Sequence, residues 1–287
     1  MIEPGPSRWP APAKINLFLH VIRRRQDGYH DIQTLFQLID LCDELQIEVT
    51  KSGKIVRPQA DYGVSEHEDL VVRAARLLQA ETGTRLGARI KVHKRIPIGA
   101  GLGGGSTDAA TTLLVLNHLW RCKLGVEALA RLGISLGADI PLFIHGRSAL
   151  ASGVGEQLTP LNLGTRHYVL VFNQWNISTA QVFSHPQLKR NASPISVSSA
   201  LSGAGRNDCE AVVCALYPEF KSVLAELAVW GKPRMTGTGS CIFLPMSDEN
   251  AAKSAAREIN CRYNVLAVRG LDRSPVHQIL GLPVQNA

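Results

Sequence analysis

The sequence predicts an α+β protein of two domains, and three observations support this fold class. With 287 residues and 45% hydrophobic content, the chain can bury a large core and is long enough for about two domains. In the first part, strand-like and helical segments surround a glycine-rich stretch. From residue 167 the order strand, helix, helix, strand, helix, strand favours an antiparallel sheet with helices on one face. We therefore predict domains at residues 1–160 and 161–287.

The first strand is predicted over residues 14–22, where apolar side chains recur at every second position. This alternation places Lys14 and Asn16 together on the opposite face, roughly 7 Å apart. A turn is predicted at residues 26–30, with further strands at residues 31–38 and 44–50 and a hairpin turn at residues 51–54. The N-terminal part is therefore expected to be rich in strands.

Helical periodicity predicts a helix over residues 69–80, and a strand at residues 89–93 leads into the glycine-rich stretch. Residues 189–205 are rich in Ser, Pro and Gly and are predicted to be an exposed loop. The other predicted elements are helices at residues 109–119, 126–136, 208–216, 219–230 and 248–259 and strands at residues 167–172, 241–244 and 263–268.

The glycine-rich stretch Pro97–Thr107 is the segment from which we infer phosphate binding. It contains five glycines in eleven residues and runs into a predicted helix. Amides of such a turn and the positive end of a helix dipole favour an anion, and Ser106, Thr107 and Asp108 could cap the helix. The stretch lacks the Gly-Lys-Ser/Thr of a Walker A loop, and no dinucleotide-binding strand and acid follow it. A flexible loop before an ordinary capped helix is the alternative.

Composition and cysteine usage limit the class of protein. The net charge of +7 and the pI of about 9.2 suit a polyanionic partner, either a nucleotide or a nucleic acid. No apolar run is long enough to span a membrane, and residues 1–12 lack the apolar stretch of a signal peptide. The six cysteines show no metal-binding spacing and are expected to be reduced core residues for the most part. We expect a cytoplasmic protein without a protein-built zinc site, and the sequence leaves the metal ligands unknown.

Several polar residues are candidates for chemistry. Asp139 follows a predicted helix end and precedes a proline by two positions, so it can be an N-cap or a general base. Lys14 is the cation that could keep this base ionised and oriented, and a surface lysine is the alternative. Tyr29 and His30 follow a glycine turn, where they could stack on and hydrogen-bond a nucleic-acid base or pack in the core. A second glycine stretch, Thr236–Ser240, is either a tight turn or a backbone wall next to a substrate.

Three separated segments resemble the GHMP small-molecule kinases. They are Pro-Ala-Lys-Ile-Asn-Leu at 12–17, the glycine-rich stretch at 97–107 and Thr-Gly-Thr-Gly-Ser at 236–240, so the resemblance spans nearly the whole chain. Four more segments are similar to a member of this superfamily whose substrate carries a cytidine diphosphate group. These are Asp-Gly-Tyr-His at 27–30, Leu-Gly-Ala-Asp-Ile-Pro at 136–141, Asn-Asp at 207–208 and Ser-Pro-Val-His at 274–277.

The resemblance implies a two-domain GHMP kinase fold, with the active-site cleft between an N-terminal mixed α/β domain and a C-terminal ferredoxin-like domain. It implies a phosphotransferase that uses ATP and Mg²⁺ and acts on an alcohol group in the non-mevalonate isoprenoid precursor pathway. The partner would be a small molecule with a cytidine diphosphate group. Neither nucleic acid nor membrane would be bound, and the chain would be a monomer or a weak homodimer.

The resemblance also implies roles for individual residues. Asp139 would take the proton of the substrate hydroxyl, and Lys14 would hold Asp139 and this hydroxyl in place. Tyr29 and His30 would hold the cytosine, with Phe183 on its far side. The residues implied to bind ATP are Lys94, Pro97, Ile98, Gly99, Ala100, Gly101, Leu102, Gly103, Gly104, Gly105, Ser106 and Thr107. The residues implied to contact the substrate are Asn16, Tyr29, His30, Thr179, Phe183, Gly237, Thr238 and Gly239.

Two positions depart from the family pattern, which has Asn where this chain has Asp69 and Asp108. The first departure puts an adenine contact in doubt. The second adds a carboxylate near the phosphates, which we expect to bind the metal or cap the helix.

Two other functions stay open. A GHMP kinase for another alcohol, such as mevalonate or homoserine, would leave Tyr29 and His30 without a base to hold. A basic nucleic-acid-binding module would bind RNA or DNA with a steep salt dependence. Such a module would leave unexplained why Lys14, Asp139 and the glycine-rich stretch occur in one chain.

Overall fold

The computed structural model describes residues 7–58 and 63–283, and two long strands organise it. Strand β1 spans Ser7–Arg24 and β2 spans His30–Thr50. They pair antiparallel from Ser7 opposite Ile47 to Arg24 opposite His30. The turn predicted at residues 26–30 joins them, so the strand-rich N-terminal part is confirmed.

The described residues form a ten-stranded sheet that continues from β2 into the second half of the chain. Its order is β3-β4-β2-β10-β7-β9-β8, with β1 and β5 paired to β2 and β6 paired to β5. Strand β2 reaches the second half through two residues, Ile39 and Leu38, which lie opposite Gly270 and Leu271 of β10. The other strands are β3 Ile55–Val56, β4 Gly87–His93, β5 Ala149–Ser152, β6 Gln157–Pro160, β7 His167–Phe172, β8 Arg234–Met235, β9 Ile242–Met246 and β10 Asn264–Leu271.

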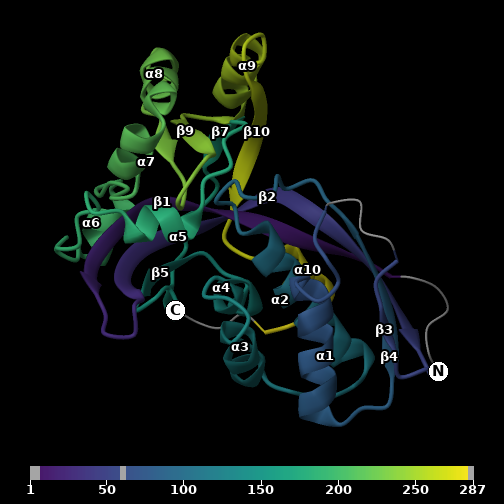
Figure 1. Cartoon of the computed structure of the whole chain (residues 1–287). Coiled ribbons are helices and arrows are strands. Elements are labelled where there is room, and N and C mark those ends of the chain that lie inside the picture. The colour runs from purple at the N-terminus through teal and green to yellow at the C-terminus, as the bar shows by residue number, and fades with distance from the viewer. Residues whose placement is uncertain (1–6, 59–62, 284–287) are drawn as a thin grey trace.

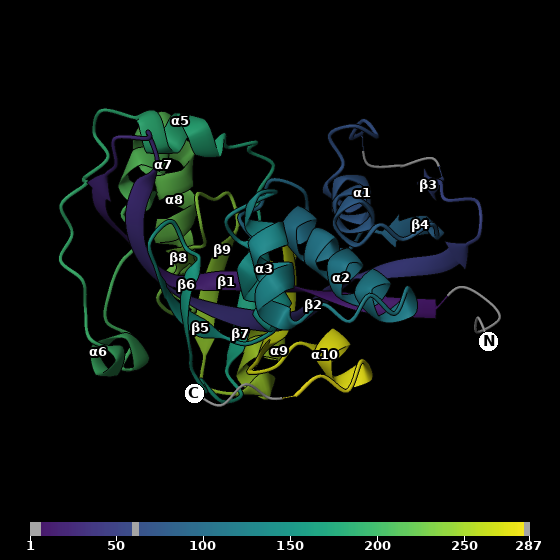
Figure 2. The same ribbon diagram turned by 90° about the horizontal axis from the view of Figure 1, so that it is seen from below.

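The helices form two groups, one for each half of the chain. The first group is α1 Leu70–Thr82, α2 Gly104–Leu119, α3 Val126–Ile134 and α4 Ile140–His145. The second is α5 Thr179–Ser184, α6 Val197–Leu201, α7 Glu210–Leu216, α8 Pro218–Leu227, α9 Glu249–Ile259 and α10 Pro275–Ile279. Figure 1 shows β1 and β2 crossing the molecule between helices α1 to α4 and the strands β7, β9 and β10. Seen from below in Figure 2, α2 and α3 cover this strand pair.

The C-terminal sheet buries both of its faces. On one face, Val169 and Val171 of β7 pack in the same cluster as Phe220 of α8 and Ile259 of α9. On the other face, Tyr168 packs with apolar residues of β1 and β2. Strands β10, β7, β9 and β8 pair antiparallel, so the predicted antiparallel sheet with helices on one face is confirmed. The boundary between residues 160 and 161 stays a prediction.

Two predictions about the first half are wrong. The strands expected at residues 31–38 and 44–50 are one strand, because Cys42 and Asp43 between them pair with Pro12 and Ala11 of β1 across a register shift. Residues 51–54 do not close a hairpin. After Thr50 the chain does not turn back to pair with β2. Strand β3 instead pairs parallel with β4, which lies between β3 and β2 in the sheet.

The helix after the glycine-rich stretch begins earlier than predicted. Helix α2 starts at Gly104, and its N-cap is Gly103, which has a φ of 74°. Ser106, Thr107 and Asp108 therefore lie inside the helix, and the prediction that they could cap it is wrong. The predicted loop at residues 189–205 also contains a short helix, α6, which Ser196 caps by accepting a hydrogen bond from the amide of Ser199.

Candidate active site

The glycine-rich stretch lines a cavity of about 380 Å³ at the N-terminus of α2. Gly99, Gly101 and Gly103 have φ values of 72°, 75° and 74°, a region that L side chains rarely adopt. The first amides of α2 have no acceptor within the helix, so they are available to an anion. The loop therefore turns free backbone amides toward the cavity, and phosphate binding there stays a prediction.

The carboxylate of Asp69, the departure that puts an adenine contact in doubt, is engaged by other groups of the protein. Asp69 lies on the cavity wall, and its Oδ1 accepts the amide of Val71 at 2.7 Å as the N-cap of α1. Its carboxylate also forms a buried ion pair with Arg57. The carboxylate is thus engaged in holding the start of α1.

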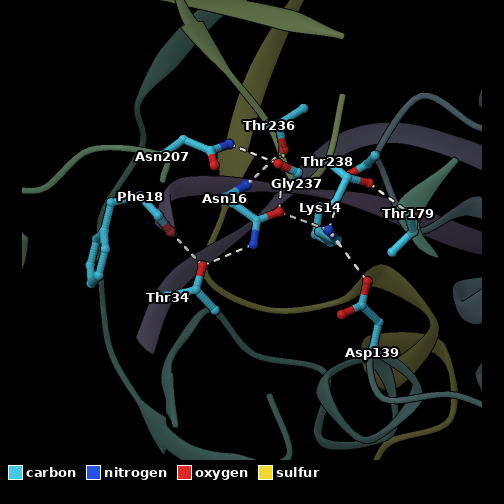
Figure 3. Close-up of polar contacts among 11 residues, drawn as sticks. Lys14, Asn16, Phe18, Thr34, Asp139, Thr179, Asn207, Thr236, Gly237 and Thr238 are labelled. Carbon is cyan, nitrogen blue, oxygen red and sulfur yellow. Dashed lines mark hydrogen bonds and ion pairs between the residues drawn. The ribbon is translucent and has the colours of Figure 1, made fainter. Parts of the chain in front are cut away.

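Lys14 lies on β1 at the centre of the polar contacts drawn in Figure 3. Its Nζ lies 2.8 Å from Oδ1 of Asn16, 3.0 Å from the carbonyl oxygen of Gly101 and 3.3 Å from Oδ2 of Asp139. The ammonium has three donors, and these three acceptors match them. Its side chain is only 4% exposed, and Nζ lies 5.3 Å from the ring centroid of Phe36. Lys14 is therefore a buried, oriented cation.

Asn16 connects Lys14 to the second glycine stretch. Its Nδ2 donates to Oγ1 of Thr34 at 2.8 Å, and its backbone amide donates to Oγ1 of Thr236 at 2.9 Å. Oγ1 of Thr34 in turn donates to the carbonyl oxygen of Phe18. Figure 3 shows this chain of contacts from β2 to Thr236. Asn16 therefore presents a fixed amide oxygen to Lys14.

The two glycine stretches touch each other. A Cβ on Gly101 would lie 2.5 Å from the carbonyl oxygen of Thr236, and one on Gly237 would lie 3.1 Å from the carbonyl oxygen of Gly101. Nδ2 of Asn207 donates to the carbonyl oxygen of Gly237 at 2.7 Å, and the hydroxyls of Thr179 and Thr238 are 2.9 Å apart. A wall from the second half, which includes Gly239, thus closes against the phosphate cradle.

Asp139 is the residue before α4, the N-cap position, yet its side chain makes no capping hydrogen bond. The carboxylate instead faces Lys14, and its side chain is 32% exposed. Oδ2 therefore stands beside a buried cation while solvent, or a substrate, can still reach the carboxyl group. Asp139 therefore occupies the N-cap position with its backbone only, and its side chain is not used for capping.

Helix α4, which follows Asp139, is held at its other end by His277 of α10. Nε2 of His277 donates to the carbonyl oxygen of Ile144 at 2.8 Å, and a Cβ on Gly146 would lie 2.2 Å from this ring. Nδ1 is buried with no hydrogen-bond partner among the described residues. Burial lowers the pKa of His277 from 6.5 to about 4, because the charged ring loses its hydration there.

His277 is expected to make folding sensitive to acid. Its pKa is lower in the folded state, so the unfolded chain binds more protons between pH 6.5 and pH 4 and stability falls as the pH is lowered through this window. The free energy of unfolding should lose about 3 kcal/mol from this residue. Urea unfolding of wild type and His277→Gln at pH 7 and pH 4 measures the difference. Equal losses in both proteins would contradict the assignment.

A buried charge cluster under the loop was not predicted. Lys94, expected to bind ATP, forms ion pairs with Asp43 and, at 2.9 Å, with Asp108. Oδ1 of Asp43 also accepts the amide of Ile96 at 2.8 Å, which fixes the entry to the glycine-rich stretch. Burial alone would lower the pKa of Lys94, but the carboxylates of Asp108 and Asp43 outweigh it and raise that pKa. Asp43 gave no local signal because it lies within a strand and only the fold brings its partners together.

The candidate base-binding residues lie at the far end of the β1–β2 pair. Tyr29 is 64% exposed, whereas His30 is buried. The rings of His30 and Phe183 have centroids 5.2 Å apart with an interplanar angle of 33°. Burial, together with the charges of Arg190 and Arg24, lowers the pKa of His30. The structure thus brings His30 and Phe183 together as a pair and leaves the ring of Tyr29 open to solvent.

Comparisons with known proteins agree with the fold. The family model of the GHMP kinases N terminal domain matches residues 69–147, and that of the GHMP kinases C terminal domain matches residues 187–265. A 4-diphosphocytidyl-2-C-methyl-D-erythritol kinase from Halorhodospira halophila is 48% identical over 277 residues, which cover 96% of both chains. The one from Chromohalobacter salexigens is 47% identical over 95% of this chain and 94% of its own.

Solved structures give the same result. A crystal structure of 4-(cytidine 5'-diphospho)-2C-methyl-D-erythritol kinase is 36% identical, covers 92% of this chain and 99% of its own, and has a TM-score of 0.82. Homoserine kinase from Cytophaga hutchinsonii, at 15% identity and a TM-score of 0.70, shares the fold. The fold and the site therefore define a small-molecule kinase of the GHMP type, and the predicted two-domain fold class is confirmed. Within that class, the chain belongs to the family of 4-diphosphocytidyl-2-C-methyl-D-erythritol kinases.

The described residues fit a nucleoside triphosphate better than a protein-built metal cage. The family implies ATP, and the cavity with its glycine cradle suits a phosphate chain. No three His, Cys, Asp or Glu side chains gather as a metal site in residues 7–58 and 63–283. Asp108 holds Lys94 beneath the loop and lies inside α2, so it does not cap this helix, and its expected contact with a metal stays a prediction. None of the helices in these residues has the length and apolar character that a membrane span requires.

Proposed function

We propose that this chain transfers the γ-phosphoryl group of ATP to the 2-hydroxyl of 4-diphosphocytidyl-2-C-methyl-D-erythritol. One observation above all supports this function: the carboxylate of Asp139 and the ammonium of Lys14, which are 125 positions apart in the sequence, lie 3.3 Å apart beside the phosphate cradle. The names of the relatives supply the substrate.

In the proposed mechanism, Asp139 accepts the proton of the substrate hydroxyl as the oxygen attacks the phosphoryl group. Lys14 orients the carboxylate and places a positive charge beside the reacting groups. The amides of the glycine-rich stretch hold the phosphates, and Lys94 supports the loop from below. Phosphoryl transfer depends mainly on such positioning and charge stabilisation. Asn16 and the wall at Gly237, Thr238 and Gly239 would hold the reacting end of the substrate.

Mg²⁺ is part of this proposal as a companion of ATP. It binds few protein oxygens and keeps phosphate and water ligands, so it needs no protein cage. It would neutralise phosphate charge when bound. We further propose that the cytosine is held at Tyr29, His30 and Phe183, with Thr179 nearby, and that the chain acts in the cytoplasm as a monomer or a weak homodimer.

The substrate is tested by measuring ADP release from ATP with purified protein and three alcohols. We expect turnover with 4-diphosphocytidyl-2-C-methyl-D-erythritol at least about 100-fold above mevalonate and homoserine, since those two leave His30 and Phe183 without a base to bind. Equal rates with mevalonate or homoserine would support the other GHMP activity. Salt-sensitive RNA binding without turnover would support the nucleic-acid alternative.

A further inference from the structure

Arg190 makes an unusual set of contacts in a segment that the sequence predicts to be a plain loop. Its Nε lies 3.0 Å from Nε2 of His30. The rest of the guanidinium donates to three backbone carbonyl oxygens: those of Phe183 at 2.9 Å, His185 at 3.0 Å and Leu188 at 3.0 Å. All four acceptors are neutral, and no carboxylate of the described residues forms an ion pair with Arg190. The side chain therefore ties the segment after α5 to β2.

This contact decides the state of the His30 ring. A guanidinium can only donate, so Nε2 of His30 must be the acceptor and must carry no proton. The ring is then neutral, with its single proton on Nδ1. Nδ1 forms no hydrogen bond to any residue within 7–58 and 63–283, so its N–H is free to donate to a ligand. The lowered pKa of His30, caused by burial and then by Arg190 and Arg24, agrees with a neutral ring.

The same guanidinium places the second ring of the pair. Arg190 donates to the carbonyl oxygen of Phe183 and so fixes the end of α5. The ring of Phe183 packs on the ring of His30, with the two centroids 5.2 Å apart. A loss of Arg190 would therefore free both the ring tautomer of His30 and the position of Phe183.

We propose that Arg190 is a positioning residue for base recognition, which holds His30 as a neutral Nδ1–H donor toward an acceptor on the edge of a pyrimidine. This inference rests on the proposed function, because the pyrimidine is the cytosine of the proposed substrate. Cytosine offers unprotonated N3 and O2 as acceptors, whereas N3 of uracil carries a proton. Arg190 thus acts on specificity through His30 and does not touch the reacting atoms.

Kinetics of Arg190→Ala test the proposal against a matched control. We expect the KM for the cytidyl substrate to rise about tenfold, the effect of losing one oriented hydrogen bond, and the KM for ATP to stay within twofold. The rise should be smaller at pH 6 than at pH 8, since without Arg190 the ring protonates closer to its ordinary pKa of about 6.5, and the protonated ring carries a donor on Nδ1 in every case. Arg24→Ala removes the other nearby charge but no hydrogen bond to His30, so its KM at pH 8 should stay within twofold.

The ¹⁵N chemical shifts of the imidazole, assigned with His30→Gln, read the tautomer without any turnover. Wild type should carry the proton on Nδ1, and Arg190→Ala should show a mixture or the Nε2 form. If the alanine variant does not fold, Arg190→Lys replaces it in these measurements. This variant keeps one donor and should retain part of the substrate affinity. An unchanged tautomer in Arg190→Ala, or parallel rises in both KM values, would overturn the proposal. If the wild-type protein did not phosphorylate the cytidyl substrate, the proposed function alone would be refuted, because the tautomer measurement does not depend on turnover.

Discussion

Replacing Asp139 with Asn is expected to lower kcat by about 10²- to 10⁴-fold, the range for a missing general base. This corresponds to roughly 3–5 kcal/mol of the activation barrier. Asn has the shape of Asp and can still occupy the N-cap of α4, but its amide cannot accept the proton of a hydroxyl. Because the side chain of Asp139 makes no capping hydrogen bond and is 32% exposed, the free energy of unfolding should change by less than about 1 kcal/mol.

Steady-state ADP release and urea unfolding of the same preparation separate the two effects. Asp248→Asn is the matched control, since Asp248 is also an N-cap, that of α9, and accepts the amide of Ala251 at 2.9 Å. Asn can keep this contact, and kcat should stay within twofold. If Asp139→Asn retained more than a tenth of the wild-type kcat while remaining folded, Asp139 would not be the base.

Local patterns in the sequence predicted the parts of the site that depend on a single element. Alternation in β1 placed Lys14 and Asn16 on one face, and the structure has Nζ 2.8 Å from Oδ1. The glycine spacing predicted an anion cradle, and the positive φ values of Gly99 and Gly101 agree with it. Both features follow from the period of a strand or the freedom of a glycine, so neighbouring residues suffice to specify them.

Contacts between distant segments could not be predicted in this way. Asp43 reads as one polar residue between two apparent strands, yet it is fully buried because Lys94 and the amides after β4 satisfy its oxygens. Arg190 sits in a stretch of Ser, Pro and Gly, and its partner His30 is 160 positions away. The hairpin expected at residues 51–54 failed for the same reason, since the pairing of β3 depends on where β4 lies.

Lys14→Met is expected to lower kcat by about 10²- to 10³-fold, comparable to the loss of one preorganised donor at a developing charge. Met keeps most of the apolar stem that lies near Phe36, so the packing is largely preserved. Three acceptors then lose their donor, those on Asn16, Gly101 and Asp139. The carboxylate of Asp139 would no longer be held toward the reacting hydroxyl, and the free energy of unfolding should also fall.

The double variant Lys14→Met/Asp139→Asn distinguishes a working pair from two separate contributions. If Lys14 acts mainly by orienting Asp139, its removal costs nothing further once the carboxylate is gone, and the double variant should have a kcat within about threefold of the slower single variant. Rates for the four proteins, each checked for folding by urea unfolding, give this coupling. Multiplying losses would instead mean that Lys14 contributes independently of Asp139, by its charge and by holding the loop through its 3.0 Å contact with the carbonyl oxygen of Gly101. In that case the 3.3 Å approach to Asp139 would be incidental to catalysis.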